Sequence, residues 1–222
     1  MNTDGERYNS ISELNNHIRI YYDAEFTGLH RNTTLVSIGL VTDHGSRFYA
    51  EFTDYDRSQV NDWIQENVID KLEMSDDCIE SIPFTDQYYH GIRNVRMRGE
   101  TSVVREELCK WLKCEANRSD TKQVQFYTDC YAYDWMLLVD LITDGKSALD
   151  MPGCIYYIPI DLSTVLWSMM EDEDVSRITF AEIDINRDLQ HSSIADAETI
   201  RECFHRIRRH QIPHRGTLIY KP

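Results

Sequence analysis

Residues 17–29 have the sequence HIRIYYDAEFTGL, and from His17 to Glu25 apolar and polar residues alternate with a period of two. One side holds Ile18, Ile20, Tyr22 and Ala24, and the other holds His17, Arg19, Tyr21, Asp23 and Glu25. Such alternation is typical of a strand with one face on a core. The stretch therefore predicts a β-strand that ends with two carboxylates on the same face.

Two further β-rich runs follow at 35–42 and 47–53, and Asp43-His44-Gly45-Ser46 between them suits a hairpin turn. Further along the chain, two strands are expected, over Val124–Tyr127 and Ile155–Ile160. Helices are expected over five stretches: Val60–Leu72, Val103–Leu112, Trp135–Ile142, from Asp161 toward Met170, and Ala195–Ile207. Three hairpin strands followed by alternating elements predict an α/β or α+β sheet with helices packed on its faces.

The length of 222 residues favours one enlarged domain, so a single domain is predicted over 1–222. With 41% hydrophobic and 11% aromatic residues, the chain is too apolar to be disordered. Its 23 basic and 38 acidic residues give a net charge of −15. Proteins that grip long nucleic acids neutralise many phosphates with Lys and Arg, so any nucleic-acid ligand should be short or held partly through cations.

No uncharged apolar run reaches the roughly 18 residues of a membrane span, since Asp140 and Asp161 interrupt the best candidates. The polar segment Met1–Ser10 is unlike a signal peptide. The six cysteines are scattered without a C-x-x-C pair, and the histidines show no zinc-ligand spacing. These features predict a cytoplasmic protein with reduced thiols and no attachment to a membrane.

Acidic residues recur where strands and helices are expected to meet. Asp23 and Glu25 lie at a strand end and can share a cation, although such a pair alone also suits a solvated strand face. Asp134 lies at a junction from strand to helix, and Asp196 lies at the start of the last helix. Four acidic groups from three distant segments are the set that a two-metal phosphoryl-transfer site requires.

His191 lies five residues before Asp196 and is the candidate general base, because an unperturbed imidazole titrates near neutrality. Asp196 has two interpretations: Ser193-x-x-Asp196 also fits a capping box, so the aspartate either caps its helix or binds a cation. Asp129 is a rival to Asp134 for the second position. An apolar helix is expected directly after Asp134, which favours Asp134 and leaves Asp129 as a turn or cap residue.

Taken together, Asp23-Ala-Glu25-Phe-Thr-Gly-Leu29, Asp134 and His191-x4-Asp196 resemble the three motifs of the DEDDh 3′→5′ exonucleases, in that family's order and spacing. The resemblance covers residues 17 to 210. It implies a ribonuclease H-like α/β fold, with a mixed five-stranded sheet flanked by helices. Several members of the family are homodimers, and the resemblance extends that expectation to this chain.

Within that family, Arg47–Asp56 and Tyr133-Asp134-Trp135 are most similar to the small stand-alone bacterial and phage exoribonucleases, the relatives of oligoribonuclease and ribonuclease T. The resemblance therefore implies metal-dependent hydrolysis of single-stranded RNA from a free 3′ end, with release of nucleoside 5′-monophosphates. DNA hydrolysis is the alternative with the same chemistry, because the contact to the 2′-hydroxyl is not visible in a sequence.

The resemblance also implies roles for individual residues. Four carboxylates would bind two Mg²⁺ or Mn²⁺ ions: Asp23, Glu25, Asp134 and Asp196. His191 would deprotonate the water that attacks the terminal phosphodiester. Backbone groups at Thr27 and Gly28 would meet the terminal nucleotide, and Leu29 would wedge between the last two bases.

Two further points stay open at the level of sequence. A non-catalytic binding or scaffold protein on the same fold is the alternative from another class, but a scaffold has no need of negative charges grouped around one point. Two groups of arginines either support the structure or bind backbone phosphates: Arg93, Arg96 and Arg98, and Arg206, Arg208, Arg209 and Arg215.

Overall fold

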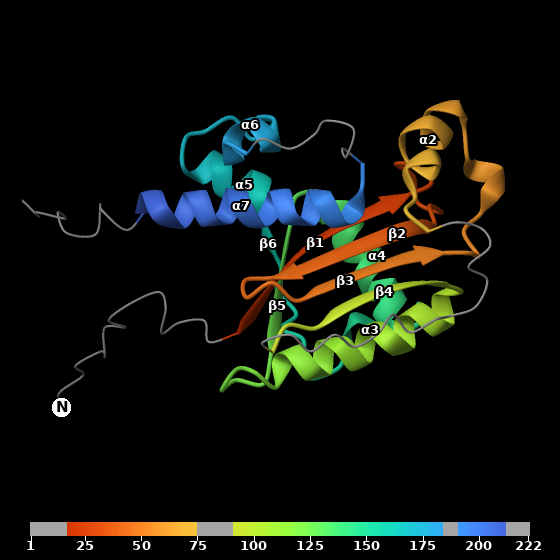
Figure 1. The fold of residues 1–222 in the computed structure, drawn as a ribbon, viewed down its shortest axis with the longest axis horizontal. Coiled ribbons are helices and arrows are strands. Elements are labelled where there is room, and N and C mark those ends of the chain that lie inside the picture. Colours follow the sequence, from red (N-terminus) through yellow and green to blue (C-terminus); the bar gives the residue numbers. More distant parts are fainter. Residues whose placement is uncertain (1–16, 75–90, 184–190, 212–222) are drawn as a thin grey trace, which may run out of the picture.

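The computed structural model describes residues 17–74, 91–183 and 191–211 (Figure 1). Its strands are β1 (Ile18–Phe26), β2 (Leu35–Thr42), β3 (Arg47–Phe52), β4 (Asn94–Gly99), β5 (Val124–Thr128) and β6 (Ile160–Asp161). Its α-helices are α2 (Asp62–Asn67), α3 (Thr101–Ala116), α4 (Tyr131–Thr143), α5 (Leu162–Ser168), α6 (Arg177–Ala181) and α7 (Ser193–Gln211). Short 3₁₀ helices are η1 (Arg57–Gln59), η2 (Ile69–Lys71) and η3 (Ala148–Asp150).

The six strands form one mixed sheet in the order β4-β3-β2-β1-β5-β6. β2 pairs antiparallel with β1 and with β3, whereas the pairs β3–β4, β1–β5 and β5–β6 are parallel. The predicted α/β class, a mixed sheet with flanking helices, is confirmed for the described part of the chain. The predicted number of five strands is wrong. The ribonuclease H-like assignment stays a prediction.

The strand predicted over Ile155–Ile160 is reduced to the two residues of β6, with Ile155 making an isolated bridge to Val124. Pro159 lacks the N–H that a ladder needs, which explains why pairing is confined to the end of this run. At the opposite edge, the arginine-containing run 94–99 forms β4, where no strand was expected.

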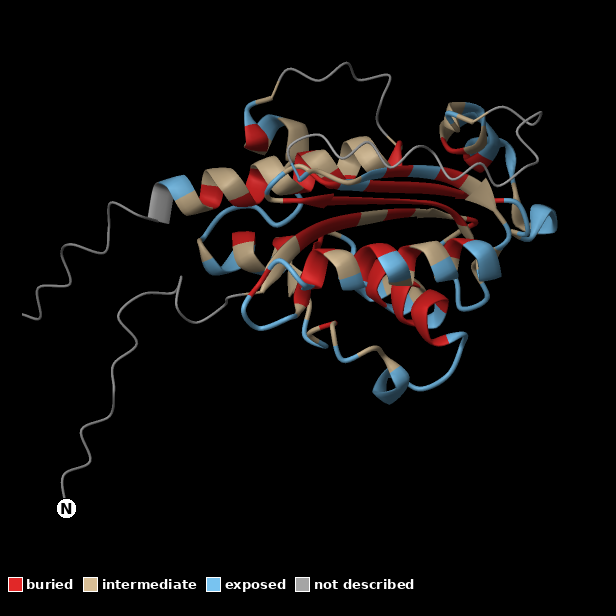
Figure 2. Ribbon diagram, turned by 60° about the horizontal axis from the view of Figure 1, so that its bottom comes forward, coloured by how far each residue is buried: buried red, intermediate tan, exposed pale blue. Residues whose placement is uncertain are grey.

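Helices cover both faces of the sheet (Figures 1 and 2). Tyr22, Ala24 and Ile38 point to the face that packs on α3 and α4, where Trp111 and Leu138 are fully buried. Tyr21 points to the other face and packs on α7 and α5. Since side chains alternate along a strand, the carboxylates of β1 lie on the α7 face.

A close approach fixes the start of α7 over β2. A Cβ added to Gly39 would lie 2.3 Å from the backbone carbonyl of Ser193, so only glycine allows this contact. The hydroxyl groups of Ser37 and Ser193 are hydrogen-bonded at 3.0 Å beside it. β1 and β2 pair through Glu25 and Ser37, so this contact brings the start of α7 to the carboxylates of β1.

Several predicted helix boundaries differ from those in the structure, and α3 extends beyond the predicted Val103–Leu112 at both ends. The helix predicted over Val60–Leu72 is broken into α2 and η2, because the backbone leaves the helical region at Val68, in a β-branched pair of weak helix formers. α4 begins at Tyr131, so Asp134 lies in its first turn rather than before it. α7 begins at Ser193, earlier than predicted.

Some predictions lie outside the described residues, namely those on Met1–Ser10, Cys78 and Arg215. The single domain over 1–222 likewise stays a prediction. Among the described helices, none combines the length and the apolar character needed to cross a membrane.

Candidate active site

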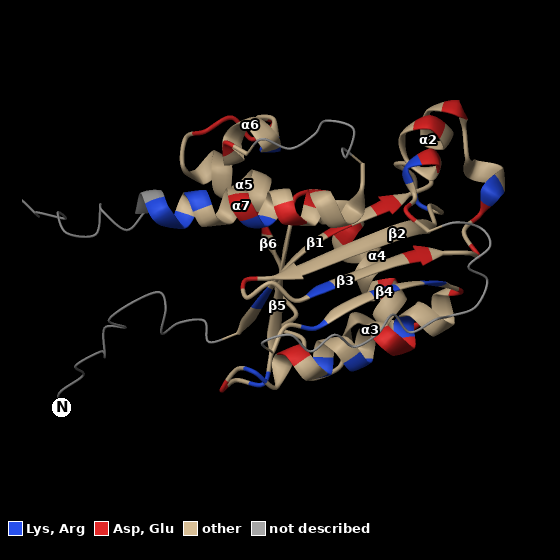
Figure 3. Cartoon of the chain, viewed as in Figure 1, with Lys and Arg blue, Asp and Glu red and all other residues tan. Residues whose placement is uncertain are grey.

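Three carboxylates converge where the end of β1 meets the first turn of α7. One carboxylate oxygen from each of Asp23, Glu25 and Asp196 lies within 4.8 Å of the other two. Figure 3 shows acidic residues at the end of β1 and along the first half of α7. Residues that are far apart in the sequence are thus brought together by the packing of α7 on the sheet.

Asp134 adds a fourth carboxylate from the first turn of α4: it is not among the three whose oxygens lie within 4.8 Å of one another, but its charge raises the pKa of Asp23. Its side chain is 1% exposed, and its Oδ2 accepts hydrogen bonds from Thr128 Oγ1 at 2.5 Å and from the backbone N–H of Cys130 at 3.3 Å. Its Oδ1 and the Oδ2 of Asp23 are buried and have no hydrogen-bond partner among the described residues. Buried oxygens of this kind are costly unless a proton or a cation compensates them.

The carboxylates of the acidic cluster (Asp23, Glu25, Asp134 and Asp196) bind protons more tightly than usual. Burial raises the pKa of Glu25 to about 8, that of Asp134 to about 7 and that of Asp196 to about 6. Burial, and next the charge of Asp134, raises the pKa of Asp23 well above its usual range. Ionising these carboxylates is therefore costly, because burial and the neighbouring carboxylates both disfavour the charged form.

This arrangement fits divalent cations. Carboxylate oxygens are the ligands that Mg²⁺ and Mn²⁺ prefer, and two of these four residues, Asp23 and Asp134, each have a buried oxygen without a hydrogen-bond partner among the described residues. The residues that could hold such ions are the four of the acidic cluster, as the sequence predicts. Their roles as ligands stay a prediction.

His191 lies at the edge of the acidic cluster in the left-handed backbone region, with φ of 64°. Its backbone N–H donates to Asp196 Oδ2 at 3.0 Å. Burial lowers the pKa of its imidazole, and the charge of Lys71 lowers it further. A neutral imidazole at neutral pH can accept a proton, which is what a general base requires.

The capping box considered for Ser193 and Asp196 is not formed. The Ser193 hydroxyl bonds to Ser37, and the Asp196 carboxylate accepts from the backbone of His191. Asp196 therefore shapes the turn that precedes α7 while it faces Asp23 and Glu25. Both functions fit one side chain because a carboxylate has two oxygens.

Asp129, the rival of Asp134, is engaged elsewhere. Its two oxygens accept from Nε and Nη2 of Arg177, each at 2.6 Å, in a bidentate ion pair. Asp134 has no such ion pair, and its Oδ1 is buried without a hydrogen-bond partner among the described residues. A cavity of about 380 Å³ extends from Asp196 and His191 to this ion pair.

The loop after β1 buries Thr27, leaves Gly28 half-buried and exposes Leu29. Thr27 is buried, and its backbone N–H donates to the Thr34 carbonyl at 3.0 Å. The N–H of Gly28 donates to Thr33 Oγ1 at 3.0 Å. Leu29, in contrast, is 71% exposed beyond the acidic cluster. Leu29 is thus free to contact a ligand, whereas the two N–H groups are used within the loop.

Two side chains near His191 carry no signal in the sequence. The indole of Trp63, 56% exposed, meets the His191 ring edge to face at 5.3 Å between centroids. The charge of Lys71 lowers the pKa of Glu25 and of Asp196. Trp63 looked like an apolar position of a long helix, and a single lysine carries no motif, so no pattern marked either residue.

Three arginines of the two basic groups form ion pairs within the fold. Arg96 pairs with Glu73 at 2.5 Å and Arg206 with Glu182 at 2.8 Å. Arg208 pairs with Asp43 at 3.0 Å. These contacts favour the structural interpretation for these three residues.

Comparison with known proteins gives a partial match. No protein-family model matches the chain. A segment of 55 residues is 34% identical to a protein named 3′–5′ exoribonuclease in Mycobacterium tuberculosis strain CDC 1551 / Oshkosh, and the same values hold for the protein of that name in strain ATCC 25618 / H37Rv. The match covers 25% of this chain, which spans 33% of the length of these curated relatives. It supports a relationship to 3′–5′ exonucleases.

Proposed function

We propose that the chain is a metal-dependent 3′→5′ exoribonuclease of the DEDDh type, which releases nucleoside 5′-monophosphates from single-stranded RNA. The observation that carries the proposal is the acidic cluster with its two unpartnered buried oxygens, next to a histidine whose pKa is lowered. The partial identity to proteins named 3′–5′ exoribonuclease supports the same class of reaction.

In this proposal Asp23, Glu25, Asp134 and Asp196 hold two Mg²⁺ or Mn²⁺ ions. Bound ions supply Lewis-acid stabilisation of the charge that develops on the phosphoryl oxygens. His191 takes the proton from the attacking water through its neutral imidazole. The hydrogen bond from its backbone to Asp196 fixes the position of the turn that carries the base.

The exposed side chains around the acidic cluster would bind the end of the strand. Leu29 and Trp63 offer apolar surface to the terminal bases, and stacking on an aromatic ring contributes about 1–3 kcal/mol per base. Lys71 adds one positive charge close to Glu25. With a net charge of −15 the chain can engage few phosphates, so a short, single-stranded 3′ end is the expected substrate.

The cellular setting and assembly are part of the proposal. The described cysteines are all free thiols, namely Cys109, Cys114, Cys130, Cys154 and Cys203, which suits a reducing cytoplasm. A homodimer is proposed from the resemblance alone. DNA hydrolysis is the alternative with the same chemistry, and a non-catalytic scaffold is the alternative from another class.

The test is incubation of the chain in Mg²⁺ with RNA and DNA oligomers labelled at the 5′ end, followed by separation of the products. A ladder that shortens from the 3′ end of RNA, with mononucleotides released, supports the proposal. The Asp134→Asn variant is the control for a contaminating nuclease. Activity on DNA alone supports the first alternative, and no activity on either substrate supports the scaffold.

A further inference from the structure

The loop between β1 and β2, residues 27–34, presents Leu29 to solvent. β1 and β3 are both antiparallel to β2, so this loop and the chain that follows β3 leave the sheet at the same end. Leu29 is exposed, and it comes four residues after Glu25 of the acidic cluster. An exposed side chain at the tip of a loop keeps one position only if other contacts hold the loop.

Gln59 of η1 supplies such contacts with both polar atoms of its side chain. Its Oε1 accepts a hydrogen bond from the hydroxyl of Thr27. Its Nε2 donates to the backbone carbonyl of Asn32 at 3.0 Å and to Oδ2 of Asp56 at 2.9 Å. A carbonyl and an ionised carboxylate only accept, so they determine which end of the amide is the nitrogen. These three hydrogen bonds, the Gln59 clamp, join residues 27 and 32 across the loop and attach both to η1.

Thr27 and Thr34 extend the Gln59 clamp into the loop. The Thr27 hydroxyl, which donates to Gln59, accepts from the N–H of Thr34 at 2.9 Å. Oγ1 of Thr34 in turn accepts from the N–H of Asp56 at 2.9 Å. Gly28 has φ of 152°, a region that favours glycine, so the chain turns directly before Leu29. The turn that exposes Leu29 is thus fixed on the side that faces η1.

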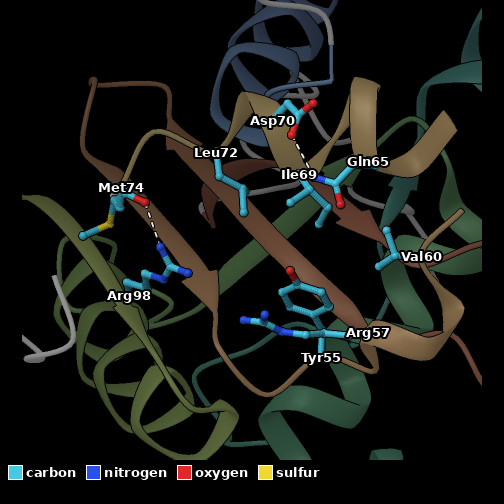
Figure 4. Close-up of a pocket in the computed structure, with 9 residues that line it drawn as sticks. All are labelled: Tyr55, Arg57, Val60, Gln65, Ile69, Asp70, Leu72, Met74 and Arg98. Carbon is cyan, nitrogen blue, oxygen red and sulfur yellow. Dashed lines mark hydrogen bonds between the residues drawn. The ribbon is translucent and has the colours of Figure 1, made fainter. Parts of the chain in front are cut away.

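The side chain of Gln59 points away from a cavity that its neighbours line. Arg57 and Val60, close to it in the chain, line this cavity of about 430 Å³, and Gln59 does not (Figure 4). Gln65 of α2 lines the cavity, and its Nε2 donates to Oδ1 of Asp70 at 2.7 Å. Gln65 thus resembles Gln59 in donating to an aspartate, but among the described residues it has no hydrogen bond to the loop 27–34.

We propose that Gln59 is a positioning residue for Leu29: the Gln59 clamp holds the loop 27–34 so that this apolar side chain meets the 3′-terminal bases in one orientation. The inference rests on the proposed exonuclease function, because it assumes that these bases lie against Leu29. A loop that is ordered before the substrate arrives loses less conformational entropy on binding, so the effect falls on affinity. The role requires no contact between Gln59 and RNA.

The first test is the kinetics of Gln59→Glu on a single-stranded RNA in Mg²⁺. The change keeps the shape of the side chain, removes both donated hydrogen bonds and sets a second carboxylate against Asp56. KM should rise about three- to tenfold while kcat changes little, because the lost contacts act on binding. Gln65→Glu is the matched control: it makes the same chemical change beside Asp70 and should leave KM and kcat at the wild-type values.

A double-mutant cycle with Leu29→Ala tests whether Gln59 acts through Leu29. Leu29→Ala alone should raise KM, and adding Gln59→Glu to it should raise KM by clearly less than Gln59→Glu does in the wild type. Additive effects would show that Gln59 acts elsewhere and would overturn the proposal. From the other end of the clamp, Thr27→Val should raise KM more than Thr27→Ser, because only serine keeps the hydroxyl.

Hydrogen exchange in the metal-free chain measures the Gln59 clamp without any activity. The amides of Gly28 and Thr34, which donate to side chains of the loop, should exchange faster in Gln59→Glu and at the wild-type rate in Gln65→Glu. If the wild type hydrolyses RNA and Gln59→Glu leaves KM or this exchange unchanged, the positioning role is wrong and the exonuclease proposal stands. If the wild type hydrolyses no RNA, the exonuclease proposal fails, and the role of Gln59 in substrate binding fails with it.

Discussion

Two acidic centres lie between β1 and α7, and they are built in opposite ways. In the first, Asp43 accepts from Arg19 at 2.6 Å, from Tyr21 at 2.7 Å and from Arg208 at 3.0 Å, and it also contacts His205. Burial opposes its ionisation, but the hydrogen bonds from Tyr21 and Arg19 outweigh burial and lower its pKa. The negative charge of Asp43 is thus compensated by neighbouring groups within the fold.

In the second centre, the acidic cluster, the pKa values are raised instead of lowered. Asp23 and Asp134 each keep a buried oxygen without a partner among the described residues. Asp43, in the turn between β2 and β3, thus stabilises the fold, whereas the four carboxylates from β1, α4 and α7 lack such compensation. The difference indicates that compensation, more than acidity, distinguishes a structural carboxylate from a functional one.

The largest effect is expected from Asp134→Asn. The Asn oxygen can still accept from Thr128 and Cys130, so the fold should be kept, while a ligand of the cations is lost. Hydrolysis of RNA should be abolished. The metal-free variant should be more stable than the wild type at pH 8 by about 1 kcal/mol, because one buried charge is removed. Product ladders and thermal melts in EDTA check both parts, and near-normal hydrolysis would contradict the ligand assignment.

His191→Ala should be slower by about 10²–10⁴-fold, the usual contribution of a positioned base. The rise in melting temperature on adding Mn²⁺ should be kept, because the side chain lost is not among the proposed ligands. Single-turnover rates and thermal melts separate the two effects. Full activity of this variant across pH 6 to 9 would remove His191 from the mechanism.

Asp43→Asn should lower the stability of the fold and leave the hydrolysis rate unchanged, the reverse of what is expected for Asp134→Asn. It leaves Arg19 and Arg208 without their carboxylate, and the cost should be about 1–3 kcal/mol, below that of a fully buried pair because this site is partly exposed. The rate of RNA hydrolysis per folded molecule should stay unchanged. Urea unfolding and initial rates are the measurements, and a loss of activity greater than the loss of folded protein would show that the two centres are coupled.

The pH dependence of metal-free stability should have opposite signs at the two centres. Raised pKa values make the acidic cluster stabilising below about pH 4, and this contribution is lost as the pH rises through about 6 to 8. Asp43, with a lowered pKa, contributes above about pH 4 and loses its contribution in acid.

Thermal melts in EDTA from about pH 3 to pH 9 measure these contributions. Asp134→Asn should flatten the fall in stability above neutrality, and Asp43→Asn should flatten the fall in acid. A wild-type chain whose stability rises between pH 6 and pH 8 in EDTA would contradict the raised pKa values of the acidic cluster.

Local patterns were sufficient for part of the fold and of the site. The alternation in 17–25 predicts β1 and the common face of Asp23 and Glu25, because a strand fixes side-chain direction residue by residue. Asp134 was preferred over Asp129 from the helix that follows it, and the structure shows Asp129 paired with Arg177.

Other features depend on contacts that the sequence does not display. Trp63 of α2 lies beside His191, and the chain breaks between α2 and η2, yet a helical period alone predicts one continuous helix. The turn before α7 is determined by Gly39, more than 150 residues earlier in the chain. Such long-range packing explains why the proximity of Trp63 to His191 and of Lys71 to Glu25 was missed.

The most direct test of the central claim is calorimetric titration of Mn²⁺ into the wild-type chain at about pH 7, in two buffers that differ in ionisation enthalpy. If the acidic cluster is an uncompensated metal site, Mn²⁺ binds and displaces protons from Glu25 and Asp134, so the observed heat depends on the buffer. Asp43→Asn should bind in the same way, and Asp134→Asn should bind far more weakly. Absence of binding, or equal binding by the wild type and Asp134→Asn, would contradict the account.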